Sequence, residues 1–470
     1  MSDLLSLSLI ELCAALDARR ASPVDLMHEV FAAVDRHNPA MRAVVAERDR
    51  GQLLHDARLA EQRIASGQGR PLEGVPLGVK DLEDAAGLPT THGSRPLRDK
   101  VADRDSTQVA RLRAAGAIVF GKTNTPEYGS GAVTKNLLFG ATGSPWDNER
   151  TPGGSSGGSA AALAGELLPL VTASDGGGSI RIPASFVGAI GLKPSFGRVP
   201  RGPFTHWDHG STIVYGPISK TVADAALFLD LTAGYESTDA ASLPAPSVSY
   251  RERLALPLAR RLRIGYSPDL GHAVVQSDIA ATVEDGVRAL EKLGHTIVPV
   301  KNAAPDVARE WSLLTAFEIG AVRGALADTH ETELGRAVLE MWRGSDPMRQ
   351  RSWGKIAEKR AELLAWCGAL FADCDVLVTP TVPFDPPPAR GPLPRDTEGR
   401  PQPHGNVATF TIPFNMSWHP ALTMRAGLSP AGFPVGLQLV AAHHREDLLL
   451  QLGSELERVL PAHPFWPLRK

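Results

Sequence analysis

Apolar residues recur every three to four positions near the start of the chain, which predicts helices over residues 6–20, 22–37 and about 48–67. Short apolar runs follow. The run VPLGVKD predicts a strand that ends near Lys80, and residues 111–127 have the pattern of a helix, a glycine turn, a strand and a loop. This alternation predicts an α/β fold in which helices cover a mixed, mostly parallel twisted sheet as α/β/α layers.

The alternation continues toward the C-terminal end of the chain. Residues 221–234 predict an amphipathic helix, residues 261–300 a strand–helix–strand unit, and residues 303–372 a long helical tract. Apolar runs at 375–383 and 433–441 predict two buried strands, and the residues after the second run predict a closing helix.

Two stretches lack any periodic pattern. Residues 380–403 contain nine prolines, which predicts an extended surface loop because proline has no N–H group for a ladder or a helix. Residues 235–250 form a Ser/Pro-rich connection. This connection could mark a domain boundary, but the strand patterns on both sides of it favour one continuous sheet.

Composition narrows the class of protein. The 470 residues are 43% hydrophobic and 21% charged, as in a soluble globular protein with a full-sized core. A formal net charge of −3 gives no reason to expect a nucleic-acid partner or a membrane surface. Three cysteines without metal-ligand spacing predict neither a disulfide framework nor a zinc site. With no signal-peptide pattern and no apolar run long enough to span a membrane, we expect a cytoplasmic protein.

The centre of the chain, residues 151–183, holds two runs of glycine and serine around a predicted short helix and a buried strand. Glycine at such junctions marks backbone with positive φ or a close approach of another group, whereas a flexible linker would be polar and continuous. In the second run, DGGGSIR, three glycines precede Ser179. A tight turn there would leave backbone N–H groups beside a hydroxyl, as a serine hydrolase requires. The run alone also fits a simple tight connection.

Other catalytic patterns are missing from the sequence. It contains neither phosphate-loop nor dinucleotide-binding motifs, no G-x-S-x-G around a candidate nucleophile, and no histidine in an evident triad context. His206 and His209 have i, i+3 spacing, but the sequence around them offers no third ligand. We therefore expect neither a metal nor another cofactor.

Four segments of the chain form a recognisable set. They are GVPLGVKD at 74–81, GKTNTPEYG at 121–129, TPGGSSGGSAAALA at 151–164 and ASDGGGSIRIPASFVGAIGLKP at 173–194. Together they resemble the amidase signature family of serine hydrolases. A weaker match, FPVGLQLVA, lies at 433–441, and the order and spacing of all five segments agree with that family over nearly the whole chain.

The resemblance implies a Ser–cis-Ser–Lys triad, with Ser179 as the nucleophile, Ser155 as a bridging serine that follows a cis peptide bond, and Lys80 as the base. A free lysine has a pKa near 10.4, so a lysine base needs burial that lowers its pKa to about 7–8. Asp81 follows Lys80 directly, but side chains of adjacent strand residues point to opposite faces, so Asp81 need not pair with it.

The resemblance also implies roles for residues around the triad. Backbone amides of three glycines would form the oxyanion hole, although many family members have isoleucine at the first of the three positions. Two further serines would support the triad, and one buried ion pair would tie the ends of the glycine loop. These residues are, in order, Gly176, Gly177 and Gly178, then Ser156 and Ser174, then Asp175 and Arg181.

The extent of the resemblance implies a single domain over residues 1–470. Within it we expect N-terminal helices at 1–70, a catalytic core at 71–234, a variable helical and loop region at 235–405 that lines the substrate pocket, and a C-terminal core strand and helix at 406–470.

The function that the resemblance implies is hydrolysis of a carbon–nitrogen bond in an amide, anilide or carbamate, and of esters too. The partner would be a small molecule of that kind, and the protein a monomer or homodimer. The alternative is the glutaminase (A-type) subunit of a tRNA-dependent amidotransferase, which usually has a tyrosine-rich helical stretch before the late strand. Residues 303–372 contain no tyrosine, which favours a stand-alone hydrolase.

Overall fold

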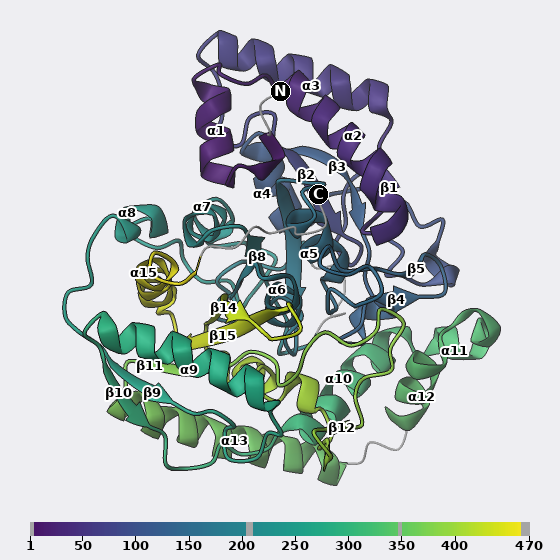
Figure 1. Cartoon of the computed structure of the whole chain (residues 1–470). Coiled ribbons are helices and arrows are strands. Elements are labelled where there is room, and N and C mark those ends of the chain that lie inside the picture. The colour runs from purple at the N-terminus through teal and green to yellow at the C-terminus, as the bar shows by residue number, and fades with distance from the viewer. Residues whose placement is uncertain (1–3, 204–209, 346–349, 462–470) are drawn as a thin grey trace.

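The structure is a computed structural model that describes residues 4–203, 210–345 and 350–461. Its centre is an 11-stranded sheet with the strand order β1-β3-β2-β6-β8-β7-β14-β15-β11-β9-β10 (Figure 1). Six strands from the first half of the chain form one part of this sheet and five strands from the second half form the other. The two parts meet where β7 pairs with β14, so that residues far apart in the sequence become neighbours there. The strands of the sheet are β1 (Val44–Glu47), β2 (Pro76–Lys80), β3 (Ile118–Thr123), β6 (Leu170–Asp175), β7 (Ile190–Lys193), β8 (Val214–Ser219), β9 (Arg263–Tyr266), β10 (Thr296–Pro299), β11 (Val376–Pro380), β14 (Ala421–Leu428) and β15 (Pro434–Ala441).

The sheet is mixed, as predicted, but the expectation that it is mostly parallel is wrong. Parallel pairing joins β3 to β2, β2 to β6, β11 to β9 and β9 to β10. The six remaining neighbours pair antiparallel. The sequence pattern revealed strands that alternate with helices, and it missed β1, β7, β8 and β14. β1 and β7 have only four residues each, and β8 and β14 contain residues that strands disfavour, Pro217 and Gly427.

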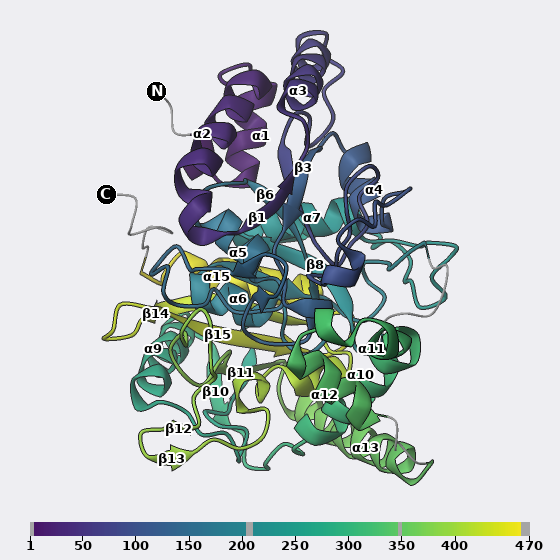
Figure 2. The ribbon, with the colours of Figure 1, turned by 90° about the vertical axis from the view of Figure 1, so that its right-hand side faces the viewer.

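Helices surround the sheet, and most lie where the sequence predicts them. Ser22 caps the helix that begins with Pro23, within the range predicted to be helical. The predicted helical tract at 303–372 is divided into α10 to α13, which gather at one corner of the molecule (Figure 2). The helices are α1 (Leu9–Asp17), α2 (Pro23–Met41), α3 (Arg50–Ala65), α4 (Thr107–Ala114), α5 (Gly157–Ala164), α6 (Arg181–Val187), α7 (Val222–Thr232), α8 (Tyr250–Leu254), α9 (Ser277–Lys292), α10 (Ala308–Arg323), α11 (Ala325–Thr329), α12 (Arg336–Ser345), α13 (Gln350–Asp373), α14 (Ile412–Met416) and α15 (Glu446–Glu457).

Shorter elements complete the chain. Two-residue strands form two small ladders, and 3₁₀ turns lie between the larger elements. They are β4 (Lys135–Asn136) with β5 (Gly140–Ala141), β12 (Asp396–Thr397) with β13 (Arg400–Pro401), and 3₁₀ turns at Leu4–Ser6, Arg95–Leu97, Glu127–Gly129, Glu331–Glu333 and Asn406–Ala408.

Two completely buried helices, α5 and α6, carry the glycine–serine runs of the central stretch into the core. Helix α5 has the sequence GGSAAALA, whose small side chains let other backbone segments approach closely. A Cβ atom on Gly158 would lie 2.2 Å from the Asn124 backbone nitrogen. Helix α6 was not predicted, because the sequence that opens it belongs to the glycine-rich run.

The proline-rich segment 380–403 is only partly the surface loop that the sequence predicts. Its first residues, 381–384, are buried. Val382 and Phe384 pack into an apolar cluster that also contains Ile182 and Phe186 of α6. These apolar side chains gain more from burial than the prolines around them lose by lacking N–H groups.

Candidate active site

Lys80 is the last residue of β2, and its side chain is completely buried. Its Nζ atom lies 2.9 Å from Ser155 Oγ, 2.8 Å from Ser156 Oγ, 3.0 Å from Ser174 Oγ and 3.3 Å from the Ser174 carbonyl oxygen. All these partners are neutral, and three of them are hydroxyls that can either accept or donate a proton. Such surroundings suit an uncharged amine, which has a lone pair that accepts a hydrogen bond.

Burial is the main cause that lowers the pKa of Lys80, to about 7. The carboxyl groups of Glu83 and Asp175 act in the opposite direction and raise the pKa of Lys80, but less strongly. Glu83 is itself completely buried, which raises its own pKa to about 7 and weakens its negative charge near neutral pH. The lysine can therefore be neutral at the pH at which a general base must work.

The carboxylate next to Lys80 in the chain has other partners, as predicted. A carboxylate oxygen of Asp81 lies 3.7 Å from Lys122 Nζ. The carboxylate also accepts two hydrogen bonds from Thr91, one from the Thr91 backbone N–H at 3.0 Å and one from the Thr91 hydroxyl. Because side chains of adjacent strand residues point to opposite faces, Asp81 and Lys80 have different surroundings. Asp81 pairs with Lys122, and Lys80 contacts neutral groups.

Ser155 follows a cis peptide bond to Gly154 and lies immediately before the buried helix α5. A Cβ atom on Gly154 would be 2.7 Å from the Gly131 carbonyl oxygen, so only glycine fits before this serine. The Ser155 hydroxyl oxygen lies 2.9 Å from Lys80 Nζ. Ser156, the N-cap residue of α5, contacts the same amine.

Ser179 lies at the start of α6, is half-buried, and lines the same cavity as Ser155. Its carbonyl oxygen accepts a hydrogen bond of 3.3 Å from the Ser156 N–H, which holds the two serine-containing loops together. Within the described part of the chain its hydroxyl forms no hydrogen bond, so the Ser179 hydroxyl faces the cavity unengaged.

A buried ion pair ties the ends of the glycine loop, as predicted. Arg181 Nε lies 2.9 Å from Asp175 Oδ2, and both side chains are fully buried. Burial alone would raise the pKa of Asp175, but the charge and hydrogen bonds of Arg181 outweigh it and lower the pKa below its ordinary value. The guanidinium also donates to Gln438 and Asn415, so the pair has further hydrogen-bond partners in the core.

The three loop glycines are not equivalent, and this corrects the prediction that all three amides are available to an oxyanion. The Gly178 N–H donates to Asp175 Oδ1 at 2.7 Å and is therefore occupied. The N–H groups of Gly176, Gly177 and Ser179 donate no hydrogen bond to any described residue. These three amides remain as the candidate donors.

The glycine at position 176 has a structural counterpart across the cavity. A Cβ atom on Gly176 would lie 2.8 Å from Ile213 Cγ1. Ile213 therefore fills the space that a side chain at position 176 would take.

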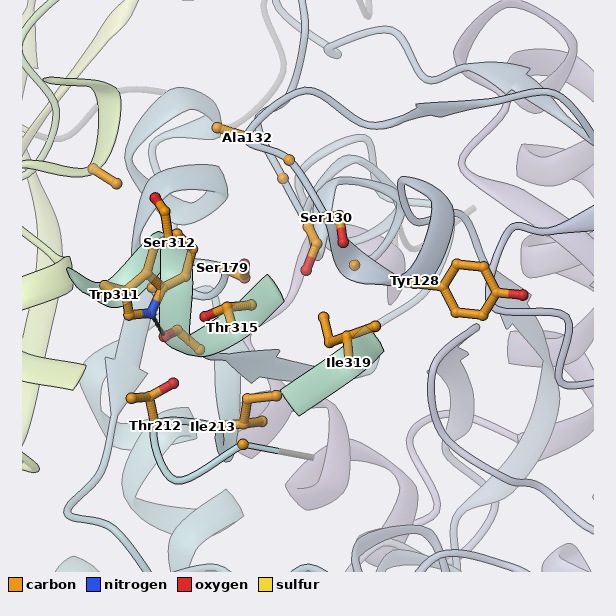
Figure 3. A pocket seen from close by; sticks show the side chains of 18 of the residues that line it. Tyr128, Ser130, Ala132, Ser179, Thr212, Ile213, Trp311, Ser312, Thr315 and Ile319 are labelled. Atoms are coloured by element: carbon orange, nitrogen blue, oxygen red, sulfur yellow. Dashed lines mark hydrogen bonds between the residues drawn. The ribbon is translucent and has the colours of Figure 1, made fainter. Parts of the chain in front are cut away.

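A cavity of about 430 Å³ opens over Ser155 and Ser179. Figure 3 shows side chains from several segments around it, including Ile213, Trp311, Thr315 and Ile319, whereas the ring of Tyr128 points away from these. Its walls are mostly apolar, and α10 forms one of them. Such a cavity fits a small, largely apolar molecule.

Sequence reasoning missed the residues that hold the glycine loop from outside. Trp311 and Thr411 donate to the carbonyl oxygens of Gly176 and Gly177, each at 2.7 Å, and Asn415 donates to the Asp175 carbonyl oxygen at 3.0 Å. No sequence signal marks these residues, because they lie 135 to 240 positions from their partners.

Metal ligation and membrane insertion find no structural support among the described residues. No group of three or more His, Cys, Asp or Glu side chains in them could hold a metal ion. His206 and His209 lie outside the described residues. The helices that the structure describes are all too short or too polar to cross a bilayer.

Comparison with known proteins gives one consistent result. Residues 25–450 match the Amidase family. An acylamidase of Rhodococcus erythropolis is 35% identical over 463 residues, which cover 97% of this chain and 96% of that protein. The A-type subunit of the glutamyl-tRNA(Gln) amidotransferase of Aromatoleum aromaticum is 32% identical over 495 residues, which cover 98% of each. The crystal structure of a bacterial aryl acylamidase, an amidase signature enzyme, matches with a TM-score of 0.92 at 27% identity and covers 98% of each chain.

The fold and the relatives define an enzyme that hydrolyses carbon–nitrogen amide bonds. The chain belongs to the amidase family, and its structural neighbours are amidase signature enzymes.

Proposed function

We propose that this amidase hydrolyses its substrate through an acyl-enzyme on Ser179, with Ser155 as the proton relay and Lys80 as the base. The observation that carries the proposal is the 2.9 Å contact between Lys80 Nζ and Ser155 Oγ in a buried site that lowers the pKa of Lys80 to about 7. A lysine in this state can accept a proton at neutral pH.

In the first half-reaction, Ser179 Oγ attacks the carbonyl carbon of the substrate while its proton passes to Ser155 and the Ser155 proton passes to Lys80. The carbonyl oxygen becomes an oxyanion. When the tetrahedral intermediate collapses, the carbon–nitrogen bond breaks, and the proton on Lys80 returns through Ser155 to the leaving amine. A water molecule then repeats the sequence on the ester and releases the carboxylic acid and free Ser179.

The oxyanion would be bound by the N–H groups of Gly176, Gly177 and Ser179. These donors lie in one loop whose carbonyl groups and ends are held by other side chains. Preorganised donors of this kind stabilise the transition state because they need not reorient during the reaction.

The substrate class that fits the cavity is a small amide, anilide or carbamate with an apolar group, and esters of similar shape. Residues 128–132, 311–319 and 407–412 line the cavity around Ser179 and supply most of its apolar surface, together with the polar side chains of Ser130, Ser312, Thr315 and Glu318. That the region 235–405 lines the substrate pocket stays a prediction. The monomeric or homodimeric state, the cytoplasmic location and the absence of a cofactor stay predictions.

The second candidate function is the glutaminase subunit of a tRNA-dependent amidotransferase. A full-length relative of that kind, 32% identical, favours it. Against it stands the tract 303–372, which lacks tyrosine. This tract lines the cavity with apolar and polar side chains alike, namely Trp311, Ile319, Ala337 and Met341, and Ser312, Thr315, Glu318 and Arg323. The missing tyrosine is therefore what favours a stand-alone hydrolase.

One experiment tests both candidates. The purified protein, without partner subunits, ATP or tRNA, is assayed with a model anilide, an ester and glutamine, and is then treated with a fluorophosphonate. We expect turnover of the anilide and ester, and one covalent adduct on the peptide that contains Ser179. Hydrolysis of glutamine alone, and only with partner subunits and tRNA, would favour the amidotransferase reading. An adduct elsewhere together with an active Ser179→Ala variant would reject the acyl-enzyme.

A further inference from the structure

A side chain of the variable helical region reaches the glycine loop of the catalytic core. The indole Nε1–H of Trp311, on α10, donates to the Gly176 carbonyl oxygen at 2.7 Å (Figure 3). Trp311 is half-buried and also lines the cavity. It therefore touches both the wall that would meet the substrate and the loop that would hold the oxyanion.

This hydrogen bond fixes the direction of a backbone donor. The carbonyl of Gly176 and the N–H of Gly177 belong to the same peptide unit, which is planar and trans, so they point in opposite directions. With its carbonyl held by Trp311, this peptide keeps the Gly177 N–H turned away from the indole. That N–H is one of those without a partner among the described residues.

The next peptide is held in the same way. Thr411 Oγ lies 2.7 Å from the Gly177 carbonyl oxygen and 3.1 Å from that of Ala408, so its proton has the shorter contact with the loop. The N–H of this second peptide, on Gly178, donates to Asp175 at 2.7 Å. The carbonyl and the N–H of the Gly177–Gly178 peptide are thus both hydrogen-bonded. In the preceding peptide, Gly176–Gly177, only the carbonyl is hydrogen-bonded, and Trp311 is its donor.

Packing reinforces the hydrogen bonds. A Cβ atom on Gly177 would lie 2.3 Å from Trp311 Cζ2, and one on Gly178 would lie 2.4 Å from Thr411 Oγ1. The indole ring and the threonine side chain rest directly against the two α-carbons. Without side chains of their own, the glycines would rotate freely if these contacts were absent.

We propose that Trp311 and Thr411 are positioning residues that aim the Gly177 N–H at the oxyanion, with Trp311 making the larger contribution. The proposal rests on the proposed function, because it needs a tetrahedral intermediate on Ser179. The side chains that orient the hole come from two segments beyond the core that carries Ser179, and one of them is also a wall of the substrate cavity.

The test is Trp311→Phe, which keeps an aromatic ring against Gly177 and removes the N–H donor. We expect kcat to fall about 10- to 100-fold with KM changed less than about twofold, since a mispositioned oxyanion donor acts on the transition state. Binding of a trifluoromethyl ketone with the substrate's acyl group, which forms an oxyanion on Ser179, should weaken by the same factor. The matched control is Trp366→Phe, on α13 and away from the cavity, which loses a 3.2 Å indole hydrogen bond to the Asn302 carbonyl oxygen.

A second pair of variants covers the case in which Trp311→Phe is unstable. Thr411→Val removes the hydroxyl at nearly constant volume and should lower kcat about tenfold, whereas Thr411→Ser should retain the wild-type value. Wild-type kcat in both Trp311→Phe and Thr411→Val, or a change confined to KM with unaltered binding of the ketone, would overturn the proposal. Failure of the proposed function gives a different result: no fluorophosphonate adduct forms on Ser179 of the wild-type protein.

Discussion

The Nζ atom of Lys80 lies 2.9 Å from the Ser155 hydroxyl oxygen, at the end of a buried strand. The other partners of the amine are two further hydroxyls and a carbonyl. The carboxylate that follows in the chain, Asp81, is directed to Lys122. Lys80 therefore has only neutral partners and can lose its proton, whereas Lys122 has a charged partner in Asp81.

The rate should depend on pH through this site. Burial lowers the pKa of Lys80 to about 7, so the amine is neutral above that pH and charged below it. We therefore expect kcat/KM to rise with pH through an apparent pKa near 7, which belongs to the coupled serines and lysine as a unit. The measurement is kcat/KM for an ester between pH 5 and 9. A profile that stays flat down to pH 5 would contradict a lysine base.

Variants of the three candidate catalytic residues should not be additive. Lys80→Ala and Ser179→Ala should each lower kcat by about 10³-fold or more, and the double variant should lose little beyond either one, because the groups act together. Lys80→Arg should be equally inactive, since a guanidinium stays protonated. Ser155→Ala should retain more activity if water replaces the relay. Near-normal kcat in Lys80→Arg would limit this side chain to a positional role.

The resemblance to the amidase signature family named Lys80, Ser155 and Ser179 as candidates, and the structure brings Lys80 and Ser155 into contact. The glycine runs next to the two serines drew attention to their loops, but the pattern alone also fitted a simple tight connection. The contact between Trp311 and Gly176 spans 135 positions, and no local pattern encodes it. Helices and the strands that alternate with them were predicted because their periodicity is regular. β1 and β7 were not predicted because they have only four residues each, and β8 and β14 because proline and glycine interrupt them.

The glycine loop also marks the limit of motif reasoning. Three successive glycines look equivalent in the sequence, yet the Gly178 amide is engaged by Asp175. Which amide is free depends on the rotation of each peptide, and side chains from distant segments set that rotation. The sequence therefore predicted the loop and its chemistry but not the distribution of its donors.

The buried ion pair of Asp175 and Arg181 should be important for stability. Asp175→Asn leaves the guanidinium buried without its charged partner, and we expect a loss of about 3–5 kcal/mol in the free energy of unfolding. Because the pKa of Asp175 is lowered in the folded state, the stabilisation is complete above the unfolded value of 3.8 and is lost only as the pH falls through the lower folded value. Denaturant unfolding at pH 7 measures the loss.

The matched control for this pair is Asp56→Asn. Asp56 pairs with Arg48 at 3.0 Å on the surface, with 36% of its side chain exposed. Removing its charge should cost less than about 1 kcal/mol, as is usual for solvent-exposed ion pairs. Equal losses in the free energy of unfolding of the two variants would mean that the buried ion pair stabilises the fold no more than the surface pair does.

A methyl group on Gly177 should disable the enzyme without unfolding it. The added Cβ would lie 2.3 Å from Trp311 Cζ2 and 2.8 Å from Cε2, and a rigid indole can only respond by moving. That movement takes Nε1 away from the Gly176 carbonyl, so the peptide between the two glycines loses its anchor. We expect Gly177→Ala to lower kcat by about 100-fold or more, comparable to the removal of one oxyanion-hole donor.

The control is Gly368→Ala, in α13, because the added methyl group there meets no atom within 4 Å. Alanine has the higher helix propensity, so this variant should be more stable by up to about 1 kcal/mol and should keep the wild-type kcat. Wild-type kcat in Gly177→Ala would show that the indole and the loop are not coupled as the contact distances imply.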